Sequence, residues 1–371
     1  MVPKIGTYLK GYLLYICLSS FLVSFEYFTI GEYIQNMILF FFEYISMAYC
    51  LNYVRFDAIS IKNFNMAIIV CSTIIIVYGI FNYITKLNPY MMYISMVADL
   101  ETDYANKFMG EQRGFLVGRV SSTFSHPLQL GQAALLLFCY ILYEMRDKLN
   151  KVLYVLILIG LILMCVLCGS RSAIFPLIVP LFFYFTNVKI GKRFLYVIVA
   201  FSILSFAYVS MPQNMQKTLK AMVFVWDEKA SFDADIKGSS ISGRADQYMA
   251  ALIATKENFL LGYGKGYVTK HGDNHPEMLG YESFVLRELL DGGLLGLLVF
   301  VFFYVLIYRA LLRNAVTSLE RARINSLCGS FFLSIFMTGV SYSFFSLYLV
   351  LCMVSYHSIR NKESAKVTVR V

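Results

Sequence analysis

The apolar residues of this chain fall into long blocks separated by short polar segments, with no alternation at a period of two residues. A helix needs about 20 consecutive apolar residues to cross a bilayer, so blocks of this length predict membrane-spanning helices and disfavour a transmembrane barrel. On this criterion we expect about ten spans. They lie at Lys10–Ile30, Tyr33–Val54, Asn65–Thr85, Leu128–Tyr143, Val152–Cys168, Ala173–Thr186, Phe194–Ser210, Gly292–Tyr308, Ile324–Thr338 and Val340–His357.

Composition supports this interpretation. The chain has 371 residues, of which 58% are hydrophobic and 15% are charged, whereas soluble domains average about 25% charged residues. The sequence therefore predicts an all-α, polytopic membrane protein that forms a single membrane domain over residues 1–371. The first apolar block is too long for the core of a cleavable signal peptide, so we expect it to remain as a span.

The net charge of +9 is distributed in a way that orients the protein in the membrane. The short loops after even-numbered spans are basic, and the intervening loops carry few or balanced charges. This positive-inside pattern predicts that both termini are cytoplasmic. The charge does not indicate a nucleic-acid-binding surface. The basic loop residues are Arg55, Lys62, Arg146, Lys148, Lys151, Lys189, Lys192, Arg193, Arg309, Arg313, Arg321 and Arg323.

Two segments on the opposite, periplasmic side are too long to be turns, Lys86–Pro127 and Met211–Asp291. Long loops in compact proteins are usually functional or disordered. The second segment lies between the seventh and eighth spans and contains the only tryptophan, Trp226. It also contains a predicted helix at Ser242–Glu257, which has a suitable N-cap residue and apolar residues at helical spacing. We therefore expect a large, partly helical periplasmic loop.

All eight cysteines lie within predicted spans, so a framework of disulfides is not expected. Cys165 and Cys168 match a CxxC pattern. Inside a membrane helix such thiols usually behave as small apolar side chains, and we interpret this pair as packing residues.

Four short polar stretches are predicted to lie at the periplasmic face, and they hold most residues suited to chemistry. They are Gly118–Pro127, Cys168–Ala173, Ser242–Gly266 and Glu282–Gly296.

Three arginines in these stretches are candidates for binding an anion. Arg171 lies in a very short turn between two spans, where a charge normally faces the bundle interior, and its fork suits a phosphate; contact with lipid headgroups is the alternative. Arg119 precedes several hydroxyls and His126 at the start of a span, which fits an anion site or a helix cap. Arg244 opens the predicted loop helix, where a cation opposes the helix dipole and requires a partner or solvent.

Titratable residues gather just before the eighth span. His271, His275, Glu277 and Glu282 include groups that can exchange protons near neutral pH when partly buried. Their spacing does not support a metal site.

Glycines mark two positions in the same region. Gly262, Gly264 and Gly266 alternate with other residues, which permits tight turns and close approach of the backbone to a ligand, or ends a helix. Gly292 and Gly296 are four residues apart, which we interpret as a site of close helix packing.

Together the four stretches resemble the O-antigen polymerase and ligase superfamily of membrane glycosyltransferases, over the region from Arg119 to Gly296. The resemblance is carried by order and spacing: an arginine before a Thr-Phe-x-His-Pro-like segment, a Ser-Arg-Ser turn, and a long loop with Gly-Arg and Glu-Asn-Phe-Leu-Leu-Gly-Tyr-Gly. A closing Gly-x-x-Gly follows. Ligases of the superfamily typically have a His-Asn pair where this chain has Glu282 and Ser283, and in this respect it looks more like the polymerases. His275, seven residues earlier, is a possible replacement for that histidine.

The resemblance implies a function at the periplasmic face of the bacterial inner membrane. The implied activity is the polymerisation of oligosaccharide repeat units, carried on undecaprenyl pyrophosphate, into O-antigen, capsular or exopolysaccharide. Arg171 and Arg244, with Arg119 as a third, would bind the pyrophosphate, and Glu282 or His275 would accept the proton of the acceptor hydroxyl. No cofactor or metal is required, because the sugar–pyrophosphate bond is already activated.

Partners and alternatives follow from the same resemblance. The implied partners are the lipid-linked oligosaccharide, membrane lipids and a chain-length regulator, with no nucleic acid. One alternative is a ligase that transfers glycan to lipid A core. The other is a flippase or transporter of lipid-linked oligosaccharide, which should place basic residues through the bundle interior. The arginines of this chain gather instead at the predicted outer face, which favours an enzyme.

Overall fold

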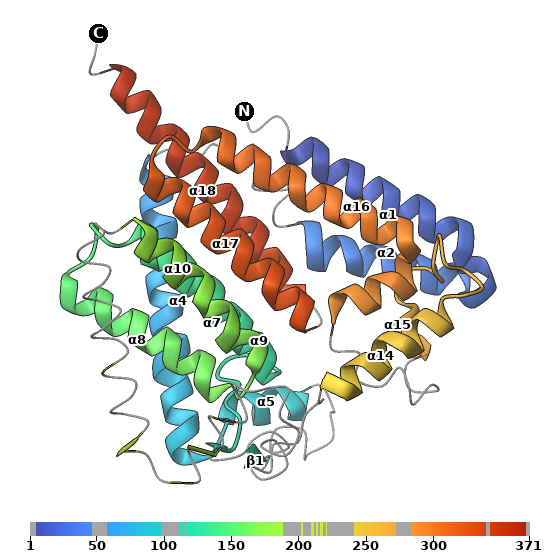
Figure 1. Ribbon diagram of the computed structural model, residues 1–371, viewed down its shortest axis with the longest axis horizontal. Coiled ribbons are helices and arrows are strands. Elements are labelled where there is room, and N and C mark those ends of the chain that lie inside the picture. Colours follow the sequence, from blue (N-terminus) through green and yellow to red (C-terminus); the bar gives the residue numbers. More distant parts are fainter. Residues whose placement is uncertain are drawn as a thin grey trace. The chain divides into compact units, whose positions relative to one another are not determined.

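The computed structural model describes residues 5–46, 58–97, 112–113, 116–187, 202, 209–210, 213, 216–217, 220, 241–271, 283–338 and 342–368. The chain forms two compact units (Figure 1), one of Asn65–Arg244 and one that combines Met1–Phe64 with Ala245–Val371. We refer to them as the central unit and the terminal unit.

The central unit is built from helices and one short hairpin. Its elements are most of α4 (Ala58–Thr85), α5 (Pro89–Val97), β1 (Gln112–Arg113), β2 (Leu116–Val117), α7 (Pro127–Glu144), α8 (Lys151–Leu167), α9 (Arg171–Ile174), the 3-10 turn η2 (Phe175–Leu177) and α10 (Ile178–Thr186). The two strands are antiparallel, with Gln112 opposite Val117. In the part of the chain that the structure describes, these are the only strands.

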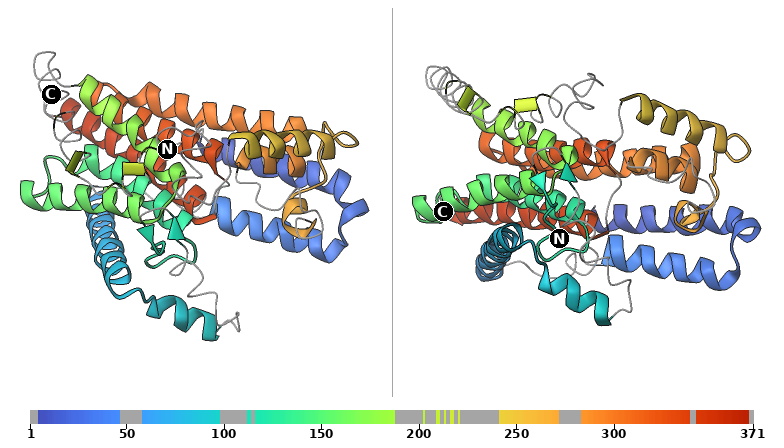
Figure 2. Two further views of the ribbon diagram at one scale, coloured as in Figure 1. Left: turned by 60° about the horizontal axis from the view of Figure 1, so that its bottom comes forward. Right: turned by 90° about the horizontal axis from the view of Figure 1, so that it is seen from below.

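The terminal unit combines helices from both ends of the chain. Its elements are α1 (Ile5–Tyr27), α2 (Ile30–Phe40), the π-helical turn η1 (Phe41–Ile45), most of α14 (Ile241–Ala254), α15 (Tyr267–His271), α16 (Phe284–Asn314), α17 (Ser318–Met337) and α18 (Tyr342–Thr368). Helix α1 packs along α16 (Figures 1 and 2). Within this contact, Tyr12 stacks on Phe303 with ring centroids 4.7 Å apart. Phe331 of α17 stacks on Tyr348 of α18 at 3.8 Å.

The predicted helical membrane architecture is confirmed. Among the described residues, three stretches are long and apolar enough to cross a membrane, judged by length and composition. They are Gly6–Val23, Ile59–Thr85 and Phe284–Asn314, and shorter apolar helices lie at Lys151–Leu167, Arg171–Thr186 and Phe345–Ile359. The expected number of about ten spans stays a prediction, because Phe194–Ser210 lies largely outside the described residues.

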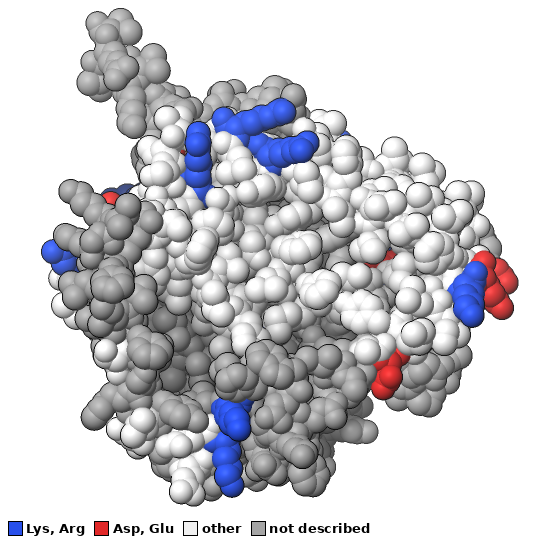
Figure 3. All heavy atoms as spheres, viewed as in Figure 1, with Lys and Arg blue, Asp and Glu red and all other residues white. Residues whose placement is uncertain are grey.

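The surface of these helices suits a lipid environment. Leu14, Leu18 and Leu22 of α1 and Val70 and Val77 of α4 are all exposed. On the face drawn in Figure 3, described lysines and arginines are few and uncharged residues dominate. Exposed apolar residues at this density are unusual for a protein in water and are expected where a helix contacts lipid.

Helix ends in the central unit follow local capping signals. Helix α7 begins after His126, whose Nδ1 accepts a hydrogen bond from Leu128 N at 3.1 Å, with Pro127 as the first helical residue. Helix α8 begins after Asn150, whose side chain accepts from Val152 N. These N-caps explain why both helices begin within one residue of the predicted spans.

Close packing of α7 on α8 and α9 fixes the turn between the latter two. A methyl group added to Gly131 of α7 would lie 2.5 Å from Cys168 Sγ and 2.7 Å from the Cβ of Ala173. Cys165 and Cys168 are buried, and the Cys168 thiol donates to Cys165 O at 3.1 Å. The interpretation of the CxxC pair as packing residues agrees with these contacts.

Candidate functional site

The Ser-Arg-Ser turn between α8 and α9 is rigid and polar. Ser170 and Ser172 are buried, and their hydroxyl oxygens lie 2.7 Å apart in a mutual hydrogen bond. Arg171 stands between them as the first residue of α9 and is half-buried. Gly169, directly before the turn, has a φ of +63°, a conformation that favours glycine. The chain therefore reverses sharply and presents the arginine at the end of two apolar helices.

Arg119 lies against this turn. Its side chain is 3% exposed, and its Nε donates to the carbonyl oxygen of Cys168 at 3.0 Å. A methyl group on Gly169 would lie 3.4 Å from Arg119 Cγ. Next in the chain, Val120 N donates to Leu167 O at 3.1 Å. Arg119 therefore caps the C-terminal end of α8, where a cation interacts favourably with the helix dipole, and it packs on the turn that carries Arg171.

A network of buried hydroxyls and amides holds the segment that contains Arg119. Asn88 Nδ2 donates to Ser121 Oγ and to Ser122 O, both at 3.0 Å. Ser122 Oγ donates to Ile75 O in α4 at 2.9 Å, and Tyr78 OH donates to Asn88 Oδ1 at 3.0 Å. Buried polar groups that satisfy one another in this way make a segment rigid. The hydroxyls that follow Arg119 in the sequence are therefore structural.

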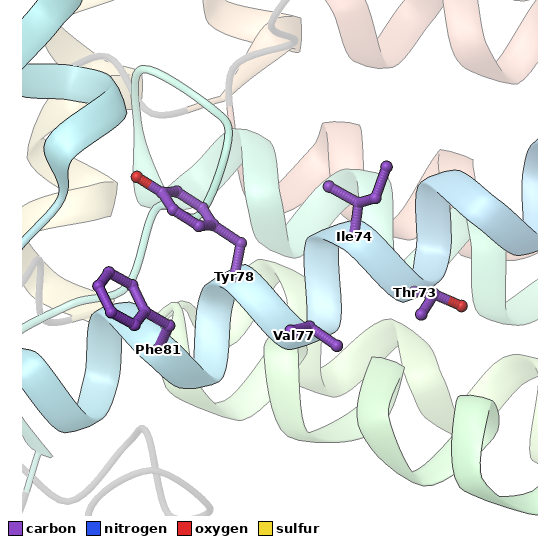
Figure 4. Close-up of a pocket in the computed structure, with 5 residues that line it drawn as sticks. All are labelled: Thr73, Ile74, Val77, Tyr78 and Phe81. Atoms are coloured by element: carbon purple, nitrogen blue, oxygen red, sulfur yellow. The ribbon is translucent and has the colours of Figure 1, made fainter.

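An apolar groove lies along α4 in the same unit. Thr73, Ile74, Val77, Tyr78 and Phe81 line it, and Figure 4 shows them along one side of the helix. None of the five is charged, and Ile74, Val77 and Phe81 are exposed. Because α4 is a candidate span, this groove is a surface for lipid and holds none of the candidate site residues.

Other predicted site residues are described in part or not at all. The backbone of Arg244 lies in α14, which begins at Ile241, so the expected N-cap Ser242 stands inside the helix. The side chain of Arg244, and all of His275, Glu277 and Glu282, lie outside the described residues. Their assigned roles therefore remain predictions.

In the terminal unit, α16 is broken near its start. Gly293 has φ +66° and ψ −169°, which interrupts the helix nine residues after Phe284. The loop after α14 fills the break: Tyr263 N donates to Leu290 O at 2.8 Å, and Leu294 N donates to Phe259 O at 2.9 Å. We call the part of α16 from Phe284 to Gly292 the half-helix.

The alternating glycines serve this contact. Gly262, with a φ of +70°, approaches α16 so closely that a methyl group on it would lie 2.5 Å from Gly293 N. The alternating glycines were expected to permit tight turns and close backbone approach, or to end a helix, and here the backbone at Gly262 closely approaches α16. Gly292 and Gly296 likewise leave room for a side chain of their own helix, since added methyl groups would lie 3.0 and 3.3 Å from Glu288 Oε1.

Three charged residues meet at the break. Lys265 Nζ lies 2.9 Å from Glu288 Oε2 and 3.6 Å from Asp291 Oδ2. Asp291 also accepts hydrogen bonds from Gly266 N at 3.3 Å and Val268 N at 3.1 Å. Glu288 is fully buried, and its Oε1 has no hydrogen-bond partner among the described residues. We call Lys265, Glu288 and Asp291 the ion cluster.

Sequence reasoning did not single out the ion cluster. A signal was present, because Glu288 and Asp291 are carboxylates just before the apolar block of the predicted eighth span, and ionisable residues at such positions are functional candidates. Lys265 had no such signal, since it lies in a loop. In the described part of the chain, no group of three or more His, Cys, Asp or Glu residues is arranged to hold a metal.

An exposed ion pair and an aromatic cluster hold α15 beside the N-terminal helices. Lys270 Nζ lies 2.8 Å from Glu32 Oε1, and this contact, with hydrogen bonds from Thr29, lowers the pKa of Glu32 to about 2. Tyr263 stacks on Tyr267 with centroids 4.5 Å apart, and burial raises the pKa of Tyr263 to about 12. Tyr263 is therefore a neutral hydrogen-bond donor, and its hydroxyl donates to a backbone carbonyl of α14.

Comparison with known proteins identifies the type of domain. The family model described as O-antigen ligase matches residues 153–301, a segment that includes the Ser-Arg-Ser turn, the α16 break and the ion cluster. No curated protein matches the chain. The match indicates a glycosyltransferase-like enzyme of the O-antigen ligase or polymerase type, which acts on lipid-linked glycans in a multi-pass membrane protein. The resemblance found in the sequence is thus confirmed, because residues 153–301 match the O-antigen ligase family model, consistent with the O-antigen polymerase and ligase superfamily.

Proposed function

We propose that this protein is a polysaccharide polymerase of the inner membrane, which joins repeat units carried on undecaprenyl pyrophosphate at the periplasmic face. The observation that carries the proposal is the family match over the segment that holds Arg171 and the start of α16. The choice of polymerase over ligase rests on Glu282 and Ser283, which stand where ligases of the superfamily typically have His-Asn.

The reaction transfers a glycan between two lipid-linked molecules. The hydroxyl oxygen of an acceptor unit attacks the anomeric carbon of the growing chain, and the bond from that carbon to the pyrophosphate oxygen breaks. The acceptor loses its proton to a base, and undecaprenyl pyrophosphate leaves with the electron pair of the broken bond. Charge therefore develops on the pyrophosphate, and preorganised cations directed at it lower the barrier.

We assign the pyrophosphate to Arg171 and Arg244, with Arg119 as a third contact. The rigid Ser-Arg-Ser turn supports the role of Arg171, because a cation that is held in place loses little entropy when it binds. Arg119 already donates through Nε to Cys168 O, so its contribution would come from the other nitrogens of the guanidinium and from orienting the turn. Removing one such donor typically costs about 3 kcal/mol of transition-state stabilisation.

Glu282 is our candidate for the base, with His275 as the alternative. Glu282 directly precedes Ser283, the N-cap residue of α16, which is 5% exposed. A carboxylate at the edge of a buried helix start is expected to lose solvent and to become a stronger base. A polymerase would also be expected to work with a chain-length regulator.

The decisive experiment uses purified protein in liposomes with lipid-linked repeat units as the sole glycan. A ladder of products spaced by one repeat unit supports the polymerase. If product forms only when lipid A core is added, the protein is a ligase. If repeat units cross the liposome membrane without any new glycosidic bond, the protein is a flippase, and the proposed enzyme function is wrong.

A further inference from the structure

The break in α16 separates two parts of the helix that can point in different directions. The half-helix carries Ser283 at its start, and it belongs with the rest of α16 to the candidate membrane span Phe284–Asn314. A continuous helix would fix both directions at once, because its hydrogen bonds run without interruption. Here the direction of the half-helix depends on whatever bridges the gap.

The backbone of the loop supplies the bridge. Four hydrogen bonds replace those that the break removes: two join Tyr263 N and Gly264 N to carbonyls of the half-helix, at 2.8 and 2.9 Å. The other two join Leu294 N and Leu295 N to loop carbonyls, at 2.9 and 3.1 Å. A buried backbone group left unpaired costs free energy comparable to a lost hydrogen bond, so these four bonds hold the loop in the break.

The ion cluster then fixes the half-helix to the end of that loop. Glu288 and Asp291 both lie on the half-helix, and Lys265 contacts both from the loop. Lys265 is itself anchored on two other helices: its N–H donates to Ser20 Oγ of α1 at 3.1 Å, and Asn36 Nδ2 of α2 donates to its carbonyl at 3.0 Å. Lys265 therefore connects the half-helix to both α1 and α2.

The charge balance is unusual for a structural contact. The cluster holds one cation and two carboxyl groups, so its formal charge is −1 in a place where Glu288 is 0% exposed. A buried ion pair is weak evidence for stability, because desolvation offsets much of the attraction. Its better-supported use is to select one geometry among several.

We propose that Lys265 is a positioning residue for the glycosyl transfer: through Glu288 and Asp291 it sets the direction of the half-helix and hence of the candidate base that directly precedes it. This inference rests on the proposed function, because a positioning role requires a reaction. The lysine touches no substrate and acts through the residues at the start of α16.

The test compares two variants of the full-length protein in liposomes. Lys265→Met keeps most of the side-chain volume and removes the cation, which changes the formal charge of the cluster from −1 to −2. Lys265→Met combined with Glu288→Gln restores the formal charge of −1 without the ion pair. The matched control is Lys270→Met, the same substitution five residues later in α15, at an exposed ion pair with Glu32. Exposed pairs contribute little, so this control is expected to keep wild-type turnover.

The expected results distinguish an effect on the position of the half-helix from an effect on the stability of the fold. We expect Lys265→Met to lower kcat about 100-fold, the loss typical of a misplacement of about 1 Å, with a nearly unchanged KM for the lipid-linked donor. Hydrogen exchange of the amides in residues 284–292 should accelerate. The double variant should recover the wild-type unfolding temperature, while its kcat stays low and exchange in the half-helix stays fast.

Three outcomes would overturn the inference. A double variant that recovers kcat together with its unfolding temperature would show that the ion pair acts only on stability. A folded Lys265→Met protein with wild-type kcat would exclude a positioning role of Lys265 in the reaction. Unchanged hydrogen exchange in residues 284–292 of Lys265→Met would show that Lys265 does not hold the half-helix. If the wild-type protein makes no polymer or ligated product, the proposed function fails, and the exchange measurement still decides whether Lys265 holds the half-helix.

Discussion

Replacing Gly293 by alanine tests how far the structure of the terminal unit depends on the break in α16. At φ +66° and ψ −169° this residue occupies a region open almost exclusively to glycine, and a non-glycine residue there costs about 1–3 kcal/mol. The added methyl group would also lie 2.5 Å from Gly262 N and closer still to the carbonyl oxygen of Leu260. Both atoms belong to the backbone, so no side-chain rotation relieves the overlap.

The loop must therefore move out of the break, and its hydrogen bonds to α16 are lost with it. Four such bonds bridge the gap, each with a net value of about 1 kcal/mol. With the conformational strain, we expect a total of about 3–6 kcal/mol, because part of the loss is recovered by water or by a rebuilt helix turn. At about 2–4 °C per kcal/mol, the unfolding temperature should fall by at least about 6 °C.

The assay is thermal unfolding of the purified protein in detergent, followed by hydrogen exchange of residues 259–268 and 284–296. The matched control is Gly11→Ala in α1, where an added methyl group meets nothing within 4 Å. There alanine should be neutral or stabilise the helix by up to about 1 kcal/mol. If Gly293→Ala unfolds at the wild-type temperature and both segments exchange as slowly as before, the bridging role of the loop is refuted.

Four further predictions address the site and the topology. Arg171→Lys should abolish polymer formation in liposomes while the protein stays folded, because an ammonium cannot reproduce the bidentate fork; wild-type ladders from this variant would remove the pyrophosphate role. Glu282→Gln should keep donor binding and lower kcat by about 10²–10⁴-fold, and a wild-type rate of chain growth would exclude Glu282 as the base. A cysteine introduced at Arg321 should resist an impermeant thiol reagent in intact cells, since its loop is predicted to be cytoplasmic; labelling there would reverse the orientation. The carboxylate of Glu32 has its pKa lowered to about 2 by Lys270, so the stability it contributes is present above the unfolded pKa of about 4.3 and is lost as the pH falls toward 2. The unfolding temperatures of wild-type protein and Glu32→Gln should therefore converge over that pH range, and a constant difference would contradict the assignment.

The positions of many helices could be read from local signals in the sequence. Apolar block length predicts α7 and α8 closely, and the caps at His126 and Asn150 fix where they begin. The turn that presents Arg171 was also predictable. Two apolar blocks are joined there by only a few residues, so the charge of Arg171 must lie at the edge of the membrane. These features depend on residues near one another in the chain, and local propensity and periodicity report on such features.

What the tertiary structure alone decided is how segments far apart in the sequence complete one another. Periodicity placed the start of the eighth span at Gly292, whereas α16 begins at Phe284 and is broken at Gly293. A break within an apolar block is stable only when another segment supplies the missing hydrogen bonds. No signal within the block predicts which segment that is. The contact of Lys265 with Glu288, 23 residues away, has the same origin. A lysine in a loop is ordinarily solvated, and Lys265 is partly buried here because the loop folds into the gap that one glycine opens in the helix.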